Sequence, residues 1–188
     1  FHDNMHELSL HVLDLVENST GAGAEQVTVT VEEDAGRDEL RIRIEDNGRG
    51  MDAEMVARVT DPFVTTRTTR KVGLWLPLMD MTTRLCDGHL RISSAVGRGT
   101  TVDAVWRLSH LDRPPLGNMA ATLKTILVMN PELHFRYRHT VGERSFLLDS
   151  EEIRLALGDL PLTQPAVLEW LDGYLKDNLS ILYGGKQA

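Results

Sequence analysis

The sequence predicts an α+β fold, a two-layer α/β sandwich in which helices cover one side of a sheet, followed by a small α+β C-terminal domain. Two observations predict the sandwich: segments with apolar residues at helical spacing alternate with hairpins whose apolar residues recur at every second position. A third observation separates the C-terminal part, because residues 110–118 contain Pro114, Pro115 and Gly117, and proline extends neither a strand ladder nor a helix interior. We therefore expect one domain at residues 5–110 and a smaller helix-hairpin-helix-helix domain at residues 117–188.

The first predicted domain begins with a helix and a hairpin. The helix is ended by the glycines at 21 and 23, and its apolar residues are Met5, Leu8, Val12, Leu15 and Val16. Two alternating segments follow on either side of a turn at residues 35–38, and their apolar residues are Val27, Val29, Val31, Leu40, Ile42 and Ile44. This pattern predicts an antiparallel hairpin with one buried face.

The remaining elements follow from the same two periods. We expect a short helix at 52–59, a polar loop through Lys71, a longer apolar helix at 73–85 and a second hairpin at 90–108. Beyond the linker we expect a helix from Met119, a hairpin at 135–147, and helices starting near Ser150 and Pro165. In that last hairpin His134, Arg136, Arg138 and His139 are expected on one solvated face, with Phe135 and Tyr137 on the other.

Polar residues on the first helix and after the first hairpin are the candidates for chemistry. Glu7, His11, Asp14 and Asn18 follow one stripe of the helix, for which a solvated helix face is the simpler interpretation. The run Asp46-Asn47-Gly48-Arg49-Gly50-Met51 places a carboxylate at a strand end beside glycines, where it can accept hydrogen bonds from an amine while the ligand approaches closely. Such a turn alone is also ordinary turn chemistry.

Four boxes in order resemble those of the GHKL superfamily, the gyrase, chaperone, histidine kinase and MutL ATPases with the Bergerat nucleotide-binding fold. They are an N box at 14–24, a G1 box at 46–51, the stretch Asp61-Pro62-Phe63-Val64-Thr65-Thr66-Arg67, and Gly97-Arg98-Gly99-Thr100. The resemblance covers about residues 5–108. It implies a histidine-kinase-like ATP-binding domain that uses Mg²⁺.

The resemblance also implies roles for single residues. Asn18 would coordinate Mg²⁺ and Asp46 would read the adenine amino group. Asp14 lies where hydrolysing members carry a glutamate that activates water, whereas histidine kinases have no base there, and Glu17 is a second candidate for which a surface charge is the simpler interpretation. The implied nucleotide-binding residues are Asn18, Asp46, Gly48, Gly50, Met51, Phe63, Arg67, Lys71, Gly73, Leu74 and Thr100.

The glycine-rich box before the long helix departs from the superfamily. The usual pattern resembles Gly-x-Gly-Leu-Gly-Leu, and here the stretch is Lys71-Val72-Gly73-Leu74-Trp75-Leu76. The helix N-terminus normally binds phosphates through free backbone N–H groups. Trp75 can therefore point into the core and leave these groups accessible, or fill the phosphate site.

Two functions of different classes follow. The first is a regulatory ATPase or protein kinase that couples its nucleotide state to a protein partner, and a homodimer is compatible with it. The alternative is a degenerate Bergerat domain that acts as a non-catalytic interaction module, as Lys71 and Trp75 suggest. Within the superfamily, the start Met5-His6-Glu7-Leu8-Ser9-Leu10-His11 looks like the small ATP-binding proteins that accompany iron-only hydrogenases. Serine kinases of the anti-sigma-factor type and DNA-processing ATPases match the C-terminal part less well.

Composition limits the partners. The 20 basic and 28 acidic residues give a net charge of −8, which disfavours non-specific nucleic-acid binding. No apolar run approaches the length of a membrane span, and the single cysteine, Cys86, fits a reducing compartment. We expect a cytoplasmic protein with no membrane partner and no transition-metal site.

Overall fold

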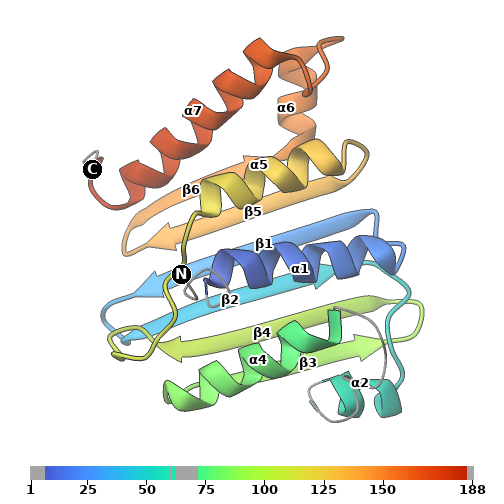
Figure 1. The fold of residues 1–188 in the computed structure, drawn as a ribbon, viewed down its shortest axis with the longest axis vertical. Coiled ribbons are helices and arrows are strands. Elements are labelled where there is room, and N and C mark those ends of the chain that lie inside the picture. Colours follow the sequence, from blue (N-terminus) through green and yellow to red (C-terminus); the bar gives the residue numbers. More distant parts are fainter. Residues whose placement is uncertain (1–6, 60, 62–71, 186–188) are drawn as a thin grey trace.

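The computed structural model describes residues 7–59, 61 and 72–185, with the backbone alone for residues 72–75. The described elements of the first part are α1 (Leu8–Gly21), β1 (Gln26–Asp34), β2 (Glu39–Asp46), α2 (Ala53–Val59), α4 (Val72–Leu85), β3 (His89–Ala95) and β4 (Gly99–Arg107). Those of the C-terminal part are α5 (Met119–Met129), β5 (His134–Val141), β6 (Arg144–Asp149), α6 (Ser150–Leu157) and α7 (Pro165–Leu182). The α+β fold predicted from the sequence is confirmed (Figure 1).

One sheet runs through the described chain. Its strand order is β3-β4-β2-β1-β5-β6, with β5 parallel to β1 and the other neighbours antiparallel. The C-terminal hairpin therefore extends the sheet of the first part instead of forming a separate one. The division into domains at residues 5–110 and 117–188 stays a prediction, but β1 and β5 of the two parts are paired from Gln26 to Glu33.

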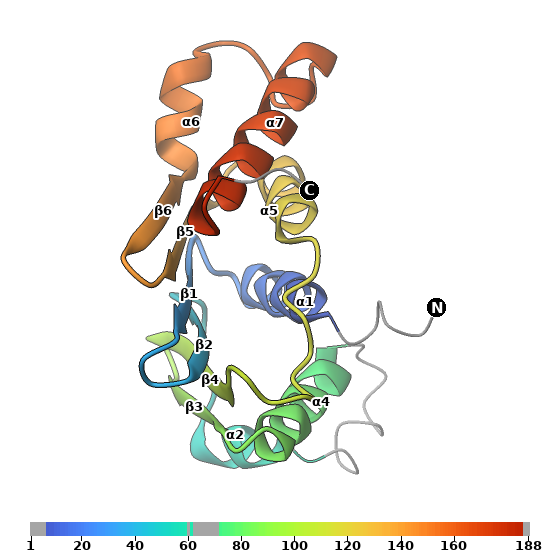
Figure 2. The same cartoon turned by 90° about the vertical axis from the view of Figure 1, so that its left-hand side faces the viewer.

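The core lies between the sheet and one layer of helices. Figure 2 shows α1, α4, α5 and α7 on the same side of the sheet, and the opposite side of the central strands is bare. Alternate residues of β1 and β2 are buried against α1, as the two-residue period predicts: Val27, Val29, Val31, Leu40, Ile42 and Ile44. Trp106 of β4 is fully buried below α4, and its indole N–H donates to the Thr82 hydroxyl at 3.1 Å.

Local chemistry explains several element ends. Asn118 caps α5 by accepting from the N–H of Ala121, Asp149 caps α6 by accepting from the N–H of Glu151, and Pro165 occupies the first turn of α7. The first helix begins at Leu8 and its predicted start at Met5 lies outside the described residues.

The prediction for one C-terminal residue is wrong. His139 was expected on the solvated face of its strand, yet it is only 1% exposed. Side chains alternate along a strand, so residue 139 shares its face with Phe135 and Tyr137, and Arg136 and Arg138 are the exposed pair. His139 hydrogen-bonds the Tyr137 hydroxyl at 2.8 Å through Nδ1 and Glu33 of β1 at 2.8 Å through Nε2.

Candidate functional site

The carboxylate of Asp46 is the point at which three motif segments meet. Because Asp46 shares its parity with Ile42 and Ile44, it lies on the helix-covered face of β2, at the strand end. Its Oδ2 accepts from the Ser19 hydroxyl of α1 at 2.6 Å, and its Oδ1 accepts from the Gly48 N–H at 2.8 Å and from the Thr100 N–H at 3.3 Å. The N box, the G1 box and the start of β4 are therefore joined by one side chain.

Two glycines let the backbone segments around Asp46 touch. A Cβ on Gly50 would lie 2.0 Å from the Ala95 carbonyl oxygen, and one on Gly99 would lie 2.0 Å from the Asp46 carbonyl oxygen. Both residues also have positive φ, +73° and +107°, which disfavours any side chain. The glycines of the two boxes thus serve close backbone approach.

The side of the turn beyond Gly50 is fixed by one serine. The hydroxyl of Ser94 accepts from the Met51 N–H at 2.8 Å, donates to the Gly99 carbonyl at 3.0 Å and lies 2.8 Å from the Thr100 hydroxyl. Gly48 is held from the other side, because the neighbouring Arg49 N–H donates to the Ala22 carbonyl at 2.9 Å. The turn has hydrogen bonds to both flanking segments and is preorganised.

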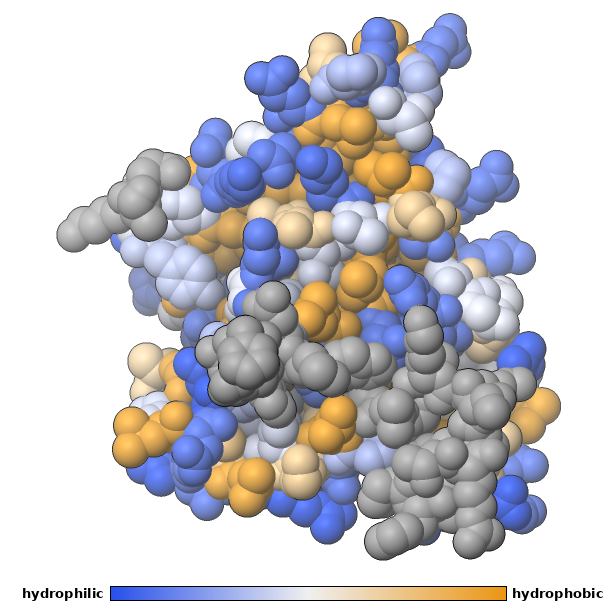
Figure 3. Space-filling view, viewed as in Figure 1, coloured by the Kyte–Doolittle hydropathy of each residue, from blue (hydrophilic) through white to orange (hydrophobic). Residues whose placement is uncertain are grey.

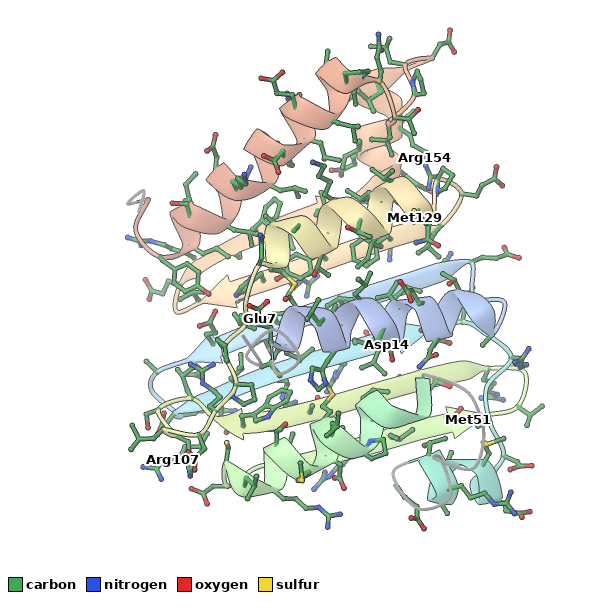
Figure 4. The ribbon with its side chains drawn as sticks, viewed as in Figure 1. Glu7, Asp14, Met51, Arg107, Met129 and Arg154 are labelled. Atoms are coloured by element: carbon green, nitrogen blue, oxygen red, sulfur yellow. The ribbon has the colours of Figure 1, made fainter. Side chains whose placement is uncertain are left out.

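The helix α1 contributes the remaining candidates. Asp14 and Asn18 lie one turn apart, and both are partly buried. Asp14 is carried by the middle of α1, which packs beside α4 (Figure 4). The interpretation of this stripe as a solvated face is wrong for His11, which is 2% exposed. His11 is therefore buried between α1 and its neighbours, whereas Asp14 and Asn18 are partly accessible.

The predicted phosphate end is described only in part. Gly73 and Leu74 lie in the first turn of α4, so a helix N-terminus begins where the glycine-rich box predicts it. Phe63, Arg67 and Lys71 lie outside the described residues, as does the side chain of Trp75. The predictions made for these residues stay predictions.

Sequence reasoning missed two residues of this site, Ser19 and Ser94. Both act by hydrogen-bonding a residue that was predicted, Asp46 and Thr100 respectively. A signal existed for Ser94, because the antiparallel register pairs Ser94 with Thr100 and Thr100 with Asp46 across three strands. Ser19 follows Asn18 on the helix and could have been found by asking which α1 side chain faces the end of β2.

The structure also has a surface hollow of about 380 Å³ at the opposite end of β2 from Asp46. Its lining includes the acidic residues Glu32, Glu33, Asp34 and Glu39 together with Arg37 and Arg41. In the described ranges, no three His, Cys, Asp or Glu side chains are grouped so that they could hold a metal ion. None of the helices described is long and apolar enough to span a bilayer.

Comparison with known families identifies the first part of the chain. The family of histidine kinase-, DNA gyrase B- and HSP90-like ATPases matches residues 4–110, which is more than half of the chain. The chain belongs to this family. The resemblance drawn from the four boxes is thereby confirmed.

Two curated relatives share the same part of the chain. The sensor protein kinase FleS of Pseudomonas aeruginosa is 42% identical over 89 residues, which cover 47% of this chain and 22% of the relative. The non-motile and phage-resistance protein of Caulobacter vibrioides is 32% identical over 97 residues, covering 49% of this chain and 12% of the relative. The chain thus spans less than a quarter of the length of these relatives.

A solved structure resembles the whole described fold. The N-terminal domain of a DNA repair protein superposes with a TM-score of 0.50 at 17% sequence identity, covering 95% of this chain and 57% of that one. At this identity the likeness concerns the fold alone, and it includes the C-terminal part.

Proposed function

We propose that the chain binds ATP with Mg²⁺ between α1, the turn after β2 and the start of α4, and that its nucleotide state is conveyed to a protein partner. The observation that carries this proposal is the Asp46 carboxylate, fixed by donors from three motif segments. Each oxygen of a carboxylate has two lone pairs, so Asp46 can accept from an exocyclic amine in addition to its protein donors. Donors already in place lower the cost of ordering the site when adenine binds.

The residues on α1 fit the proposed magnesium ion. A magnesium ion usually takes one or two protein oxygens and the phosphate oxygens of its nucleotide, and keeps several waters, so a single amide oxygen from Asn18 suits it. The ion, when bound, neutralises phosphate charge and holds the phosphates in one orientation.

Asp14 is the proposed acceptor of the proton from an attacking water. Asp14 lies on the same face of α1 as Asn18, one turn toward the N-terminus, so its carboxylate and the metal ligand face the same space. If instead the phosphoryl group passes to a protein, the acceptor hydroxyl or imidazole brings its own partner, and Asp14 is dispensable. We propose a regulatory ATPase or protein kinase, and Asp14 distinguishes the two.

Titration calorimetry with a non-hydrolysable ATP analogue, with and without Mg²⁺, tests the binding step. We expect saturable binding that is tighter with Mg²⁺ and weaker in Asn18→Ala only when Mg²⁺ is present. No heat and no thermal stabilisation at millimolar nucleotide would remove the proposal in favour of the interaction module. In that case Trp75→Gly with Lys71→Gly is expected to restore binding, because these two residues replace glycines of the phosphate box.

Turnover is tested separately with Asp14→Asn. We expect the variant to bind nucleotide with unchanged affinity and to lose hydrolysis by about 100-fold or more, the usual contribution of a positioned general base. Phosphate release measured under single-turnover conditions reports the chemical step. Hydrolysis at the wild-type rate in Asp14→Asn would show that Asp14 is not the base. The base would then be Glu17, or the protein would be a kinase in which Asp14 is dispensable.

A further inference from the structure

Helix α1 lies in the middle of the helix layer, between α4 and α5 (Figure 1). Of its fourteen residues only Glu17 and Gly21 are exposed. The other helices of the layer expose large apolar side chains to solvent (Figure 3), among them Met81 of α4, Met129 of α5 and Trp170 of α7. Because α1 carries the proposed ligand of Mg²⁺ and the proposed base, the contacts that hold α1 also place these two groups.

The C-terminal end of α1 is held by the turn that follows β2. The Ser19 hydroxyl donates to the Asp46 carboxylate at 2.6 Å. The Ala22 carbonyl, just past the helix, accepts from the Arg49 N–H at 2.9 Å. Both contacts join α1 to the segment that carries the proposed adenine-binding carboxylate, so this end of the helix is fixed by the nucleotide site itself.

The N-terminal end of α1 is held by the linker between the two parts of the chain. The first N–H groups of an α-helix have no acceptor within the helix, and the N-cap residue Glu7 contributes no side-chain hydrogen bond. The linker supplies the acceptors instead, because the Leu8 N–H donates to the Pro115 carbonyl at 2.9 Å and the Ser9 N–H donates to the Leu116 carbonyl at 2.8 Å. Backbone carbonyls of the linker thus take the place of a side-chain cap.

Two further contacts fix the first turn of α1. Gly117 of the linker has a φ of +78°, and a Cβ on it would lie 2.7 Å from the Cβ of Glu7, which lies where the linker passes the start of α1 (Figure 4). The buried Thr122 hydroxyl of α5 donates to the Ser9 carbonyl at 3.2 Å. The first turn is therefore attached to the linker and to the first helix of the C-terminal part.

The position of this first turn affects Asp14 more than Asn18. At 1.5 Å of rise per residue, Leu8 lies about 21 Å from Ala22 along the helix axis, Asp14 about 12 Å and Asn18 about 6 Å. If the first turn of a rigid α1 moves while its other end stays at the turn after β2, Asp14 moves just over half as far and Asn18 less than a third as far. Asp46 stays in place. A misplacement of about 1 Å is enough to slow a catalysed reaction strongly.

We propose that Gly117 and Thr122 are positioning residues of the nucleotide site, which hold the start of α1 so that Asp14 and Asn18 meet the phosphate end of the nucleotide. This inference rests on the proposed function and makes its partner coupling specific. A partner protein that moves the linker or α5 alters the chemistry at the phosphates more than the binding of adenine. Because such coupling is reciprocal, bound nucleotide alters the affinity for that partner by the same factor.

Calorimetry on the full chain with a non-hydrolysable ATP analogue, with and without Mg²⁺, tests the proposal in Gly117→Ala. The new Cβ pushes the first turn of α1 away. We expect the affinity without Mg²⁺ to stay within about twofold of wild type, and the gain in affinity on adding Mg²⁺ to fall about threefold. Single-turnover hydrolysis, which depends on Asp14, should fall about tenfold. Adding Glu7→Gly removes the atoms that the new Cβ meets and should restore both values.

Matched controls separate positioning from stability. Gly142→Ala also places alanine at a positive φ, +59°, but its Cβ meets nothing within 4 Å, so the magnesium gain and hydrolysis should not change. Thr122→Val removes one hydrogen bond to α1 and should lower hydrolysis about threefold. Thr125→Val, which removes a hydroxyl that donates to Ala121 within α5 itself, should leave hydrolysis unchanged.

The outcomes distinguish this inference from the proposed function. A purely structural role would lower the free energy of unfolding of Gly117→Ala in urea and leave the magnesium gain unchanged, which would overturn the inference. Equal losses of the magnesium gain in Gly117→Ala and Gly142→Ala would also overturn it. A wild-type chain that binds no nucleotide would instead remove the proposed function. For a chain that binds nucleotide without hydrolysing it, the magnesium gain alone decides.

Discussion

Two carboxylates on the helix-covered face of the first hairpin are held by different kinds of hydrogen-bond donor. Asp46 ends β2, and Glu33 lies near the end of β1 at the other end of the hairpin. Asp46 accepts from a hydroxyl of α1, from one backbone N–H inside the glycine turn and from one at the start of β4. Glu33 is bound by the His139 ring and the Tyr183 hydroxyl, both from the C-terminal part of the chain.

The difference suits the two carboxylates to different roles: Asp46 can bind a ligand, and Glu33 links distant parts of the chain. The donors around Asp46 are one short serine side chain and two backbone N–H groups, so they fix its position and leave its oxygens able to accept more. The donors around Glu33 are long side chains from β5 and from the end of α7, and they close around it. Glu33 thereby ties β5 and the end of α7 to β1, whereas Asp46 joins α1, the turn after β2 and the start of β4.

The largest expected effect on stability and nucleotide binding comes from substituting Gly50 in the turn that follows Asp46. Gly50→Ala puts a Cβ 2.0 Å from the Ala95 carbonyl oxygen at a φ of +73°, so the turn must move away from β3. We expect a loss of about 3 kcal/mol of stability, together with loss of nucleotide binding. Denaturant unfolding and calorimetry measure the two effects.

Gly142 is the matched control at the Glu33 end. It also has a positive φ, +59°, but a Cβ there meets nothing within 4 Å. Gly142→Ala should cost only the backbone strain, about 1–2 kcal/mol, and leave nucleotide affinity unchanged. Equal losses in the two variants would show that close approach at Gly50 is unimportant.

The second prediction exchanges the two carboxylates for amides. Asp46→Asn replaces an acceptor oxygen by an NH₂ group that faces existing donors, and we expect nucleotide affinity to fall about 10–100-fold. Glu33→Gln should destabilise the chain and leave affinity within about twofold of wild type. Calorimetry at a temperature where both variants are folded tests this pair. A large loss of nucleotide affinity in Glu33→Gln would show that Glu33 also supports nucleotide binding and would contradict the comparison.

The sequence predicts the Asp46 end far better than the Glu33 end. The Asp46 end is made of contiguous motifs, so a box of six residues contains the acid, its glycines and its turn. Glu33 is 106 residues from His139 and 150 residues from Tyr183. The C-terminal part comes close to Glu33 only because β5 pairs in parallel with β1. Neither the spacing of apolar residues nor a sequence motif predicts which strand a distant hairpin pairs with.

Misplacing His139 has the same origin. The sequence shows a basic run with aromatic residues interleaved, and the polar character of histidine suggested the solvated face. The two-residue period already placed residue 139 with Phe135 and Tyr137. The missing information was the partly buried acid Glu33, whose hydrogen bond to the ring lowers the cost of burying a histidine.

The smallest expected effect concerns Tyr183 and depends on pH. Burial alone would raise the pKa of Glu33, but hydrogen bonds from His139 and Tyr183 and nearby positive charge outweigh it and hold the pKa below the ordinary value of 4.5. Burial and the same hydrogen bond raise the pKa of Tyr183 well above its ordinary 10.0, so its hydroxyl remains a donor near neutral pH. Because half of Tyr183 is exposed, we expect Tyr183→Phe to cost only about 1 kcal/mol near neutral pH.

The sign of the pH dependence follows from the lowered pKa of Glu33. A carboxylate with a depressed folded-state pKa contributes stability above its unfolded value of 4.5, and this contribution is lost as the pH falls through the folded-state value. The stability difference between wild type and Tyr183→Phe should therefore be largest near neutral pH and shrink below 4.5, because a protonated Glu33 binds the hydroxyl less strongly. Urea unfolding across this range measures the difference. The rings of Tyr183 and His139 also pack edge to face, with their centroids 6.2 Å apart. A stability difference that stays constant on acidification would mean that Tyr183 stabilises α7 by this packing and that its hydrogen bond to Glu33 contributes little.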